Sequence, residues 1–489
     1  MKLYLNGHRE RYALEQLQMC LFPEESMEYC EAPFRGDGAV SSLFRGKQYL
    51  TASAKINWRG KTGYHRCCMK LSEETVTLRR RLLQRCYYLS ALQILGEAPP
   101  WGAMAGVRPS KLSSRELLSG GSLASADRLL RDVYFVSPER RKLCLQCSEA
   151  TVKAAGLLQP TDISLYIGIP FCPSRCSYCS FVSNSIERCG DLLEPFVQTL
   201  LRETEETGKL LRASPFCLRS IYMGGGTPTT LSAEQLDRVL LALEKNFDLS
   251  RLLEFTVEAG RPDTLTKEKL QVLRRHGVDR ISINPQSMSD EVLKRVGRKH
   301  SAADLIRCYK EAEGLGFSAI NMDLIAGLPG DTPDGFADSL QKLIALSPAN
   351  ITVHTLALKK ASDLYQKREG LLSDAQVAEI LEHAEQALRT AGYIPYYLYK
   401  QKYMSGSFEN IGWCKPGYEG LYNIFMMEEL SSILALGGGG MNKVNLPGGK
   451  IERFHNPKYP KEYLEQIDST LAQKKEIFRM MEESLSKKE

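Results

Sequence analysis

The stretch PFCPSRCSYCSF, residues 170–181, puts three cysteines into one short loop directly after a run of β-forming residues, SLYIGIPF (164–171). Cys172, Cys176 and Cys179 follow a C-x3-C-x2-C spacing at the C-terminal end of a predicted strand. Soft thiolates select zinc or iron–sulfur clusters, and structural zinc sites use four ligands. Three thiols therefore favour a four-iron cluster that leaves one iron open to an external ligand.

A regular alternation continues downstream of this loop, with short β-rich runs separated by segments of helical periodicity. The six runs are SLYIGIPF (164–171), SIYMGGGT (220–227), EFTVEA (254–259), RISINPQ (280–286), AINMDLIAGL (319–328) and ITVHTLA (351–357). Helical patterns between them include 231–247 and 289–316, the second ending on glycine in the manner of a helix C-cap. Six β/α units predict an α/β fold with a parallel sheet, and periodicity leaves a doubly wound sheet and an incomplete barrel both open.

Three domains are expected from the order of these patterns. Residues 1–158 alternate in the β manner near 39–69 and then become strongly helical, which predicts an α+β accessory domain. The core is expected over 159–375, and a C-terminal region over 376–489 is expected to be a helical extension that completes and caps the site. The segment PPWGAMAGVRPSKL (99–112) fits an ordered connection better than a docking loop, because proline and glycine first signal turns.

Composition excludes several classes of protein. With 489 residues, 43% of them hydrophobic and 25% charged, the chain can bury large cores. A net charge of +6 without a basic tract gives no reason to expect nucleic acid as a partner. No targeting segment and no apolar stretch of about eighteen residues is found, so we expect a cytoplasmic protein without a membrane partner. Fourteen cysteines then fit thiols plus a metal site better than a disulfide framework.

The cysteine loop resembles that of the radical S-adenosylmethionine (SAM) superfamily. MGGGTPT (223–229), one β/α unit later, is similar to the glycine-rich strand end of that family, where bare backbone lets SAM approach closely. The resemblance implies an incomplete (β/α)6 barrel. It also implies one [4Fe–4S] cluster, held by Cys172, Cys176 and Cys179, with SAM bound to the open iron. These three cysteines would take part in catalysis through the cluster.

Further motifs over about residues 160–445 resemble the oxygen-independent coproporphyrinogen III oxidase family. In chain order they are YIGIPFC (166–172), GGGTPT (224–229), VEAGRPD (257–263), SINPQS (282–287) and NMDLIAGLPGDT (321–332). The long N-terminal region with GVRPSKL (106–112), together with residues 397–429, is most similar to the oxidase-like branch called HemZ.

The resemblance implies a set of SAM contacts in this chain. Tyr166 would lie against SAM, and Tyr178 takes the aromatic position between the second and third cysteines. Glu258, at the end of the third run, matches a carboxylate that contacts SAM. The glycine-rich strand end would line the same cofactor with Gly225, Gly226 and Thr227.

Other positions match those that bind a second SAM molecule in the oxidases. These are Gln286, Arg298 and Asp323, with Ala357 and Met441 as backbone or packing neighbours. Judged from the residues alone, Arg298 would be a solvated cation at a helix end and Asp323 a strand-end cap.

Two departures from the oxidase pattern concern the substrate. The oxidases typically read HIPFC before the first cysteine, whereas Gly168 stands here in place of the histidine, as in the HemZ-like branch. They also often carry a fourth cysteine after the third, and Ser180 and Phe181 stand here instead. Cluster and SAM binding do not depend on either position.

The resemblance implies that the substrate is a porphyrinogen. Its propionate side chains would be decarboxylated to vinyl groups for haem biosynthesis, with electrons from a reducing partner such as flavodoxin or ferredoxin. Cations should meet the substrate carboxylates, and the available ones are Lys359, Lys360, Lys400 and Arg108.

One alternative function stays open, and a second is disfavoured. A related branch carries haem as a chaperone instead of making its precursor, and it would need an axial ligand such as His354, although a lone histidine on a strand is more often a satisfied core residue. An RNA-modifying radical enzyme would need a zinc site, and Cys144 and Cys147 supply only half of one.

Overall fold

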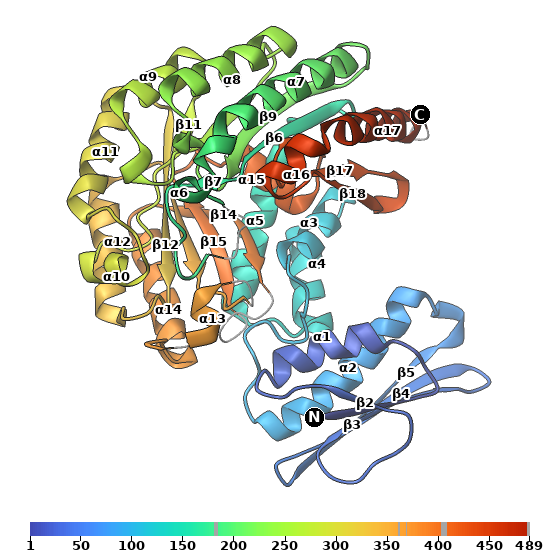
Figure 1. Cartoon of the computed structure of the whole chain (residues 1–489). Helices are drawn as coiled ribbons and strands as arrows, with labels where there is room; N and C mark the ends of the chain where they lie inside the picture. Colours follow the sequence, from blue (N-terminus) through green and yellow to red (C-terminus); the bar gives the residue numbers. More distant parts are fainter. Residues whose placement is uncertain (180–183, 360–361, 368, 402–407, 487–489) are drawn as a thin grey trace. The chain divides into compact units, whose positions relative to one another are not determined.

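The computed structural model describes the whole chain except residues 180–183, 360–361, 368, 402–407 and 487–489 (Figure 1). Contacts between residues divide the chain into two compact units, Met1–Ser148 and Glu149–Glu489. The division falls inside helix α5 (Pro138–Ala155), upstream of the expected boundary at residue 158. The segments expected as core and C-terminal region lie together in the second unit, because strands from both join one sheet.

The first unit is a five-stranded sheet with its buried face against two helices. The strand order is β2-β1-β3-β4-β5, with parallel pairs at β1 and antiparallel pairs from β3 to β5. Alternate residues of β4, from Leu50 to Ile56, are buried in one cluster with Leu14 and Leu83 of the helices, so the period-two pattern yields a one-sided core. The elements are β1 (Lys2–Asn6), α1 (Arg11–Leu21), β2 (Glu28–Cys30), β3 (Gly38–Arg45), β4 (Tyr49–Trp58), β5 (Lys61–Lys70), α2 (Val76–Leu95), α3 (Ser110–Leu118), α4 (Leu123–Arg128) and most of α5.

The second unit contains one mixed sheet of eleven strands, in the order β14-β15-β13-β12-β11-β10-β9-β6-β16-β17-β18. The six runs found in the sequence are β6 and β9 to β13, which are neighbours and all parallel. The predicted α/β fold with a parallel sheet is thus confirmed. These six strands are β6 (Asp162–Ile169), β9 (Cys217–Gly225), β10 (Glu254–Glu258), β11 (Arg280–Ser282), β12 (Ala319–Ala326) and β13 (Asn350–Thr355).

Helices follow the parallel strands, and Figure 1 shows α8, α9, α11 and α12 in an arc outside them. Ser232 and Ser301 begin α8 and α11 with capping boxes that the sequence encodes. The helical pattern over 289–316 is divided into α10 and α11, because Gly297 takes a φ of +81° and interrupts it. The helices are α6 (Ile186–Cys189), α7 (Leu193–Arg212), α8 (Ala233–Asn246), α9 (Lys267–Arg275), α10 (Asp290–Arg295), α11 (Ala302–Gly314), α12 (Pro333–Leu346), α13 (Asp363–Lys367), α14 (Asp374–Thr390), α15 (Leu421–Glu428), α16 (Pro460–Glu465) and α17 (Ile467–Ser486).

The C-terminal region extends the sheet at both ends. β14 and β15 pair antiparallel beyond β13, whereas β16 pairs parallel with β6 and leads into β17 and β18. The described residues of this region therefore contribute five strands besides their helices, and the aromatic run IPYYLYK (394–400) is itself β-forming. The strands are β14 (Ile394–Lys400), β15 (Glu409–Cys414), β16 (Ser432–Gly437), β17 (Met441–Asn445) and β18 (Ile451–His455).

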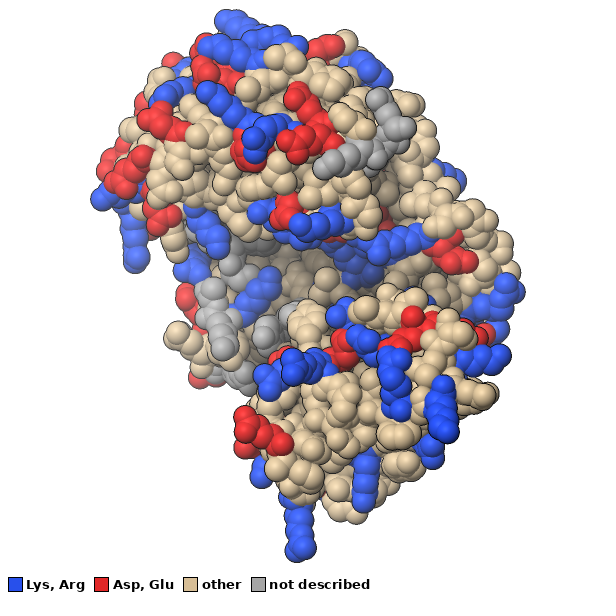
Figure 2. Space-filling model, turned by 90° about the vertical axis from the view of Figure 1, so that its right-hand side faces the viewer, with Lys and Arg blue, Asp and Glu red and all other residues tan. Residues whose placement is uncertain are grey.

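The surface charges and the helices of the described residues bear on possible partners. On the face that Figure 2 draws, Lys and Arg side chains are interspersed with Asp and Glu. None of the described helices is both long enough and apolar enough to cross a membrane.

Candidate functional site

The cysteine loop begins where β6 ends. Because the six strands are parallel neighbours, their C-terminal ends lie at one edge of the sheet, and the loops that follow them meet there. Phe171–Cys172 forms the short strand β7, which pairs with β8 (Asn184–Ser185). Two later segments anchor the loop: Ser177 N donates to the carbonyl of Val296 at 3.1 Å, and Leu364 N donates to the carbonyl of Ser177 at 3.0 Å.

The three thiols of this loop have different neighbours. Cys172 Sγ lies 3.5 Å from Thr227 Oγ1, and the buried Cys176 has its Sγ 3.9 Å from Nη1 of Arg261. Cys179 N donates to the carbonyl of Cys176 at 3.0 Å. Within the described ranges, no three Cys, His, Asp or Glu side chains converge on a single metal ion. Thiolates that bind separate irons of one cluster need no such convergence.

A glycine turn at the end of β9 packs against this loop. A Cβ on Gly226 would lie 2.4 Å from the carbonyl oxygen of Phe171, and a Cβ on Gly224 would lie 2.9 Å from Cδ of Glu258. Gly225 has a φ of +113°, which residues with side chains avoid. Only bare backbone allows β9 to approach the cysteine strand and Glu258 this closely.

Glu258, at the end of β10, lies among tyrosines. Its Oε1 accepts a hydrogen bond from the hydroxyl of Tyr222. The Tyr222 ring stacks with those of Tyr166 and Tyr422, at centroid distances of 6.3 and 4.6 Å. Burial raises the pKa of Glu258 to about 7 despite the hydrogen bond from Tyr222, and the charge of Asp323 adds to the rise. A carboxyl group with this pKa can hold or release a proton near neutral pH.

The segment after β11 has a strained backbone at Gln286. Its φ is +70°, in the left-handed region that residues other than glycine rarely adopt. Backbone pairing with β12 holds it there, since Gln286 N donates to the carbonyl of Asp323 at 2.9 Å and Ile325 N donates to the carbonyl of Gln286 at 3.0 Å. Gln286 Oε1 is buried and lacks a hydrogen-bond partner among the described residues. A buried amide oxygen in this condition is costly unless a ligand supplies a donor.

Arg298 connects this segment to the cysteine loop. Its Nε donates to the hydroxyl of Tyr178 at 3.3 Å, and its Nη1 donates to the carbonyl of Asn284 at 2.7 Å. Arg298 is only 9% exposed, so it is not the solvated cation that the residue pattern alone favours. Tyr178 packs against the apolar cluster that contains Val296 and Leu364.

Asp323 and His354 form a polar pair on the neighbouring strands β12 and β13. His354 Nε2 lies 3.5 Å from an Asp323 carboxylate oxygen, and its Nδ1 lies 3.4 Å from the hydroxyl of Tyr399. Burial opposes ionisation of Asp323, but hydrogen bonds from His354 and Asn321 outweigh it and lower the pKa of Asp323 below its ordinary value. Asp323 is therefore an anion at neutral pH. Both ring nitrogens of His354 have partners, as expected for a satisfied core histidine.

The structure gives a physical reason for Gly168. A Cβ at this position would lie 2.4 Å from the carbonyl oxygen of Gly438, so backbone occupies the place of a side chain. Met441, a predicted packing neighbour of SAM, opens β17 just after this glycine segment. Ser180 and Phe181, where other family members often have cysteine, lie outside the described residues.

The remaining predicted positions are less closely tied to the site. Ala357 follows β13, and Lys359 lies in the same loop, partly exposed. Lys400 is buried at the end of β14. Lys360 lies outside the described residues, and Arg108 belongs to the first unit.

Three residues near the cysteines and Glu258 were missed from the sequence. Tyr222 lies two residues before Gly224 in a strand, so period-two alternation could have assigned it to the same face. Arg261 follows a strand beside glycine and proline, a pattern typical of an exposed turn, yet it is 3% exposed. His300 is buried, and neither ring nitrogen has a hydrogen-bond partner among the described residues.

Comparison with known proteins agrees with this geometry. Residues 166–343 match the model of the radical SAM superfamily. The chain is 36% identical, over 90% of its length and 91% of the relative, to the oxygen-independent coproporphyrinogen-III oxidase-like protein HemZ of Bacillus subtilis. It is 31% identical to the heme chaperone HemW of Escherichia coli, over 62% of this chain and 76% of the relative.

A solved structure supports the same fold. Coproporphyrinogen III oxidase (HemN) from Escherichia coli, described as a radical SAM enzyme, aligns with a TM-score of 0.52 and 23% identity over 66% of this chain and 73% of its own. Radical SAM proteins use a [4Fe–4S] cluster and SAM, and the matched residues include the three cysteines and the glycine turn. The chain belongs to the radical SAM superfamily and, within it, to the family of oxygen-independent coproporphyrinogen III oxidases and their oxidase-like relatives.

Proposed function

We propose that this protein is a radical SAM oxidoreductase that decarboxylates the propionate side chains of a porphyrinogen to vinyl groups, as a coproporphyrinogen III dehydrogenase does. The observation that carries the proposal is the meeting of three features at one edge of the parallel sheet. They are the three-cysteine loop, the glycine turn of β9 and the Glu258–Tyr222 pair. The similarity to the oxidase-like relative named HemZ supports the class of substrate.

The residues of the site fit the cofactors of the family. Cys172, Cys176 and Cys179 would hold one [4Fe–4S] cluster, because their thiols lie on one anchored loop and need not meet at a single ion. The glycine turn would meet SAM with bare backbone, because residues 224–226 carry no side chain and pack closely against the cysteine strand and Glu258. Tyr166 would lie beside the cofactor, Thr227 Oγ1 lies 3.5 Å from Cys172 Sγ, and Tyr178 stands between Cys176 and Cys179 in the sequence.

A second SAM would be held by the segment after β11. The unpartnered Oε1 of Gln286 can accept a hydrogen bond from it, and the anionic Asp323 can pair with its positive charge. Arg298 would orient a carboxylate there, with Ala357 and Met441 as neighbours.

When bound, the reduced cluster and SAM supply the power to remove hydrogen from an unactivated C–H bond. The chain contributes binding, orientation and exclusion of water. Stacked rings of Tyr166, Tyr222 and Tyr422 wall the interior with apolar surface, which protects a reactive species from solvent. Glu258 can hold a proton or accept a hydrogen bond, according to pH, because its pKa lies near 7.

Recognition of the substrate needs cations, and its turnover needs an electron source. Lys359, partly exposed on the loop after β13, can meet a propionate carboxylate. The electron for the cluster would come from a reduced protein of the flavodoxin or ferredoxin type.

A haem chaperone is the second candidate, because heme chaperone HemW relatives match at up to 35% identity. It would require an axial ligand for haem iron. His354 could serve only after giving up Asp323 or Tyr399, since each of its nitrogens already has a partner. This cost favours the oxidoreductase.

The test uses the full chain, loaded anaerobically with iron and sulfide. SAM, dithionite and coproporphyrinogen III are added, and 5′-deoxyadenosine and vinyl products are measured by liquid chromatography with mass spectrometry. Cys176→Ala should form neither product, whereas Cys189→Ala, in a cysteine outside the motif, should retain both.

The outcomes separate the two candidates. Formation of 5′-deoxyadenosine with an untouched porphyrinogen would refute the substrate and keep the radical chemistry. Stoichiometric haem binding without either product would favour the chaperone. A cluster that responds to SAM in Cys176→Ala would contradict the assignment of the cysteine loop.

A further inference from the structure

Arg261 is a buried cation that connects β10 to the cysteine loop. Its Nη1 donates to the carbonyl of Ser174 at 3.0 Å and lies 3.9 Å from the sulfur of Cys176. Its Nε and Nη2 donate to the two carboxylate oxygens of Asp263, at 2.9 and 2.7 Å. The guanidinium is therefore fixed in one orientation, with an N–H group beside a cysteine sulfur.

The charges near Cys176 do not cancel. Arg261 is paired with Asp263, whereas the buried Arg298 donates to two neutral oxygens, the hydroxyl of Tyr178 and the carbonyl of Asn284. His300 lies in the same environment, where burial and the charge of Arg298 lower its pKa to about 4, so it is neutral at pH 7. The guanidinium groups of Arg261 and Arg298 thus both contact the described part of the loop, and the carboxylate of Asp263 pairs with the first of them.

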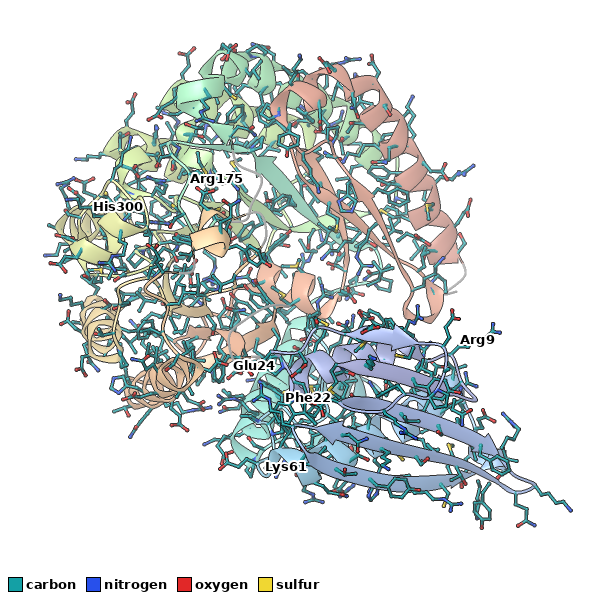
Figure 3. The ribbon with its side chains drawn as sticks, turned by 60° about the horizontal axis from the view of Figure 1, so that its bottom comes forward. Arg9, Phe22, Glu24, Lys61, Arg175 and His300 are labelled. Atoms are coloured by element: carbon teal, nitrogen blue, oxygen red, sulfur yellow. The ribbon has the colours of Figure 1, made fainter. Side chains whose placement is uncertain are left out.

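The segment that follows α10 packs against the cysteine loop. Figure 3 labels Arg175 of the cysteine loop and His300 of the segment after α10. The two segments touch, because Ser177 N donates to the carbonyl of Val296, and a Cβ on Gly297 would lie 3.7 Å from the carbonyl oxygen of Arg175. The segment that carries Arg298 and His300 therefore packs against the cysteine loop.

We infer that Arg261 is a positioning residue that fixes the cysteine loop and raises the reduction potential of the iron–sulfur cluster. The inference rests on the proposed function, because it requires the cluster. Hydrogen bonds to cluster sulfurs and nearby positive charge stabilise the reduced form more, since that form carries one more negative charge. The step is a one-electron reduction in which an external reductant loses the electron, the cluster gains it, and no bond forms or breaks.

The test measures the midpoint potential of the cluster in the full chain, titrated with dithionite and followed by electron paramagnetic resonance. Arg261→Met removes both the donor and the charge. At the wild-type midpoint potential, the ratio of reduced to oxidised cluster should therefore fall about tenfold, which corresponds to a midpoint lowered by about 59 mV. Arg261→Lys keeps the charge and should shift the potential less. Asp263→Asn removes the compensating carboxylate and should shift it in the opposite direction.

A matched control uses an arginine away from the cysteines. Arg275, at the end of α9, is exposed and pairs with Asp237, so Arg275→Met should leave the potential unchanged. Opposite shifts in Arg261→Met and Asp263→Asn would support the inference. An Arg261→Met chain with full iron content and an unshifted midpoint would overturn it.

Two further outcomes are decisive. If Arg261→Met loads no cluster, an unshifted midpoint in Asp263→Asn overturns the inference on its own. If the wild-type chain loads no cluster, the proposed function fails together with the inference. If the wild-type chain loads a cluster but the variants do not shift its midpoint potential, the inference alone fails.

Discussion

The raised pKa of Glu258 predicts how the stability of the protein without cofactors changes with pH. Glu258 is hydrogen-bonded to Tyr222, and its pKa rises from 4.5 to about 7, chiefly through burial. Between these two values the folded chain keeps a proton that the unfolded chain has lost. The stabilisation is therefore fully present below pH 4.5 and is lost as the pH rises through 7.

The size of the effect follows from the shift. Each pKa unit corresponds to about 1.4 kcal/mol, so the free energy of unfolding should fall by about 3 kcal/mol between pH 4.5 and 8 because of Glu258 alone. Glu258→Gln has no titrating group at this position and keeps a hydrogen-bonding side chain of similar shape. The difference in stability between wild type and Glu258→Gln isolates this part of the pH dependence from all other groups.

The assay is urea unfolding at a series of pH values, followed by tryptophan fluorescence. Trp413, buried on β15, reports on the second unit, which contains Glu258. Glu268→Gln, in an exposed glutamate at the start of α9, is the control and should show no such change. A wild-type minus Glu258→Gln difference that stays constant from pH 4.5 to 8 would refute the reasoning that Glu258 is a buried acid.

Three other predictions follow from the same contacts. We expect SAM to bind the ionised form of Glu258. Its affinity, measured by anaerobic calorimetry, should then rise up to about tenfold for each pH unit as the pH increases towards 7 and stay constant above it, whereas the affinity of Glu258→Gln should not change with pH. Gly168→Ala should lower the free energy of unfolding by about 1–3 kcal/mol because its Cβ meets backbone, whereas Gly190→Ala, with open space at its Cβ, should not. Lys474→Met should cost about 3–5 kcal/mol in urea unfolding, because it leaves a buried carboxylate without its cation, and the exposed neighbour Lys475→Met should cost little.

The parallel strands were predictable because their sequence carries a local signal. Runs such as 164–171 and 319–328 are apolar and bounded by turn residues, and each became a strand at nearly the expected position. The helical pattern over 289–316 was less reliable, because periodicity does not register the positive φ of Gly297. The strands after residue 376 were missed although several pair with their sequence neighbours, as β17 does with β18. The place of β16 in the parallel sheet could not be found locally, because its partner β6 lies far away in the sequence.

Some features of the candidate site follow from local sequence, and others depend on distant segments of the chain. The cysteine spacing and the glycine turn are local patterns, and resemblance assigned them roles. The burial of Arg261 and the positive φ of Gln286 depend on segments that fold back from elsewhere. A Gly-Arg-Pro sequence favours an exposed turn, and only the position of Ser174 and Cys176 makes its arginine a buried donor.

Distant parts of the chain likewise determine that position 168 has no room for a side chain. The backbone that fills its place runs through Gly437, which donates from its N–H to the buried carboxylate of Glu203 on α7 at 2.8 Å. That carboxylate also accepts a hydrogen bond from Asn456 at 3.1 Å and lies 3.4 Å from Nζ of Lys474 on α17. Because α7 and α17 together fix the glycine segment, returning the histidine of the oxidases at position 168 alone would collide with it. The difference from the oxidase pattern therefore rests on the C-terminal packing, and a histidine at position 168 would require residues 437–440 to move as well.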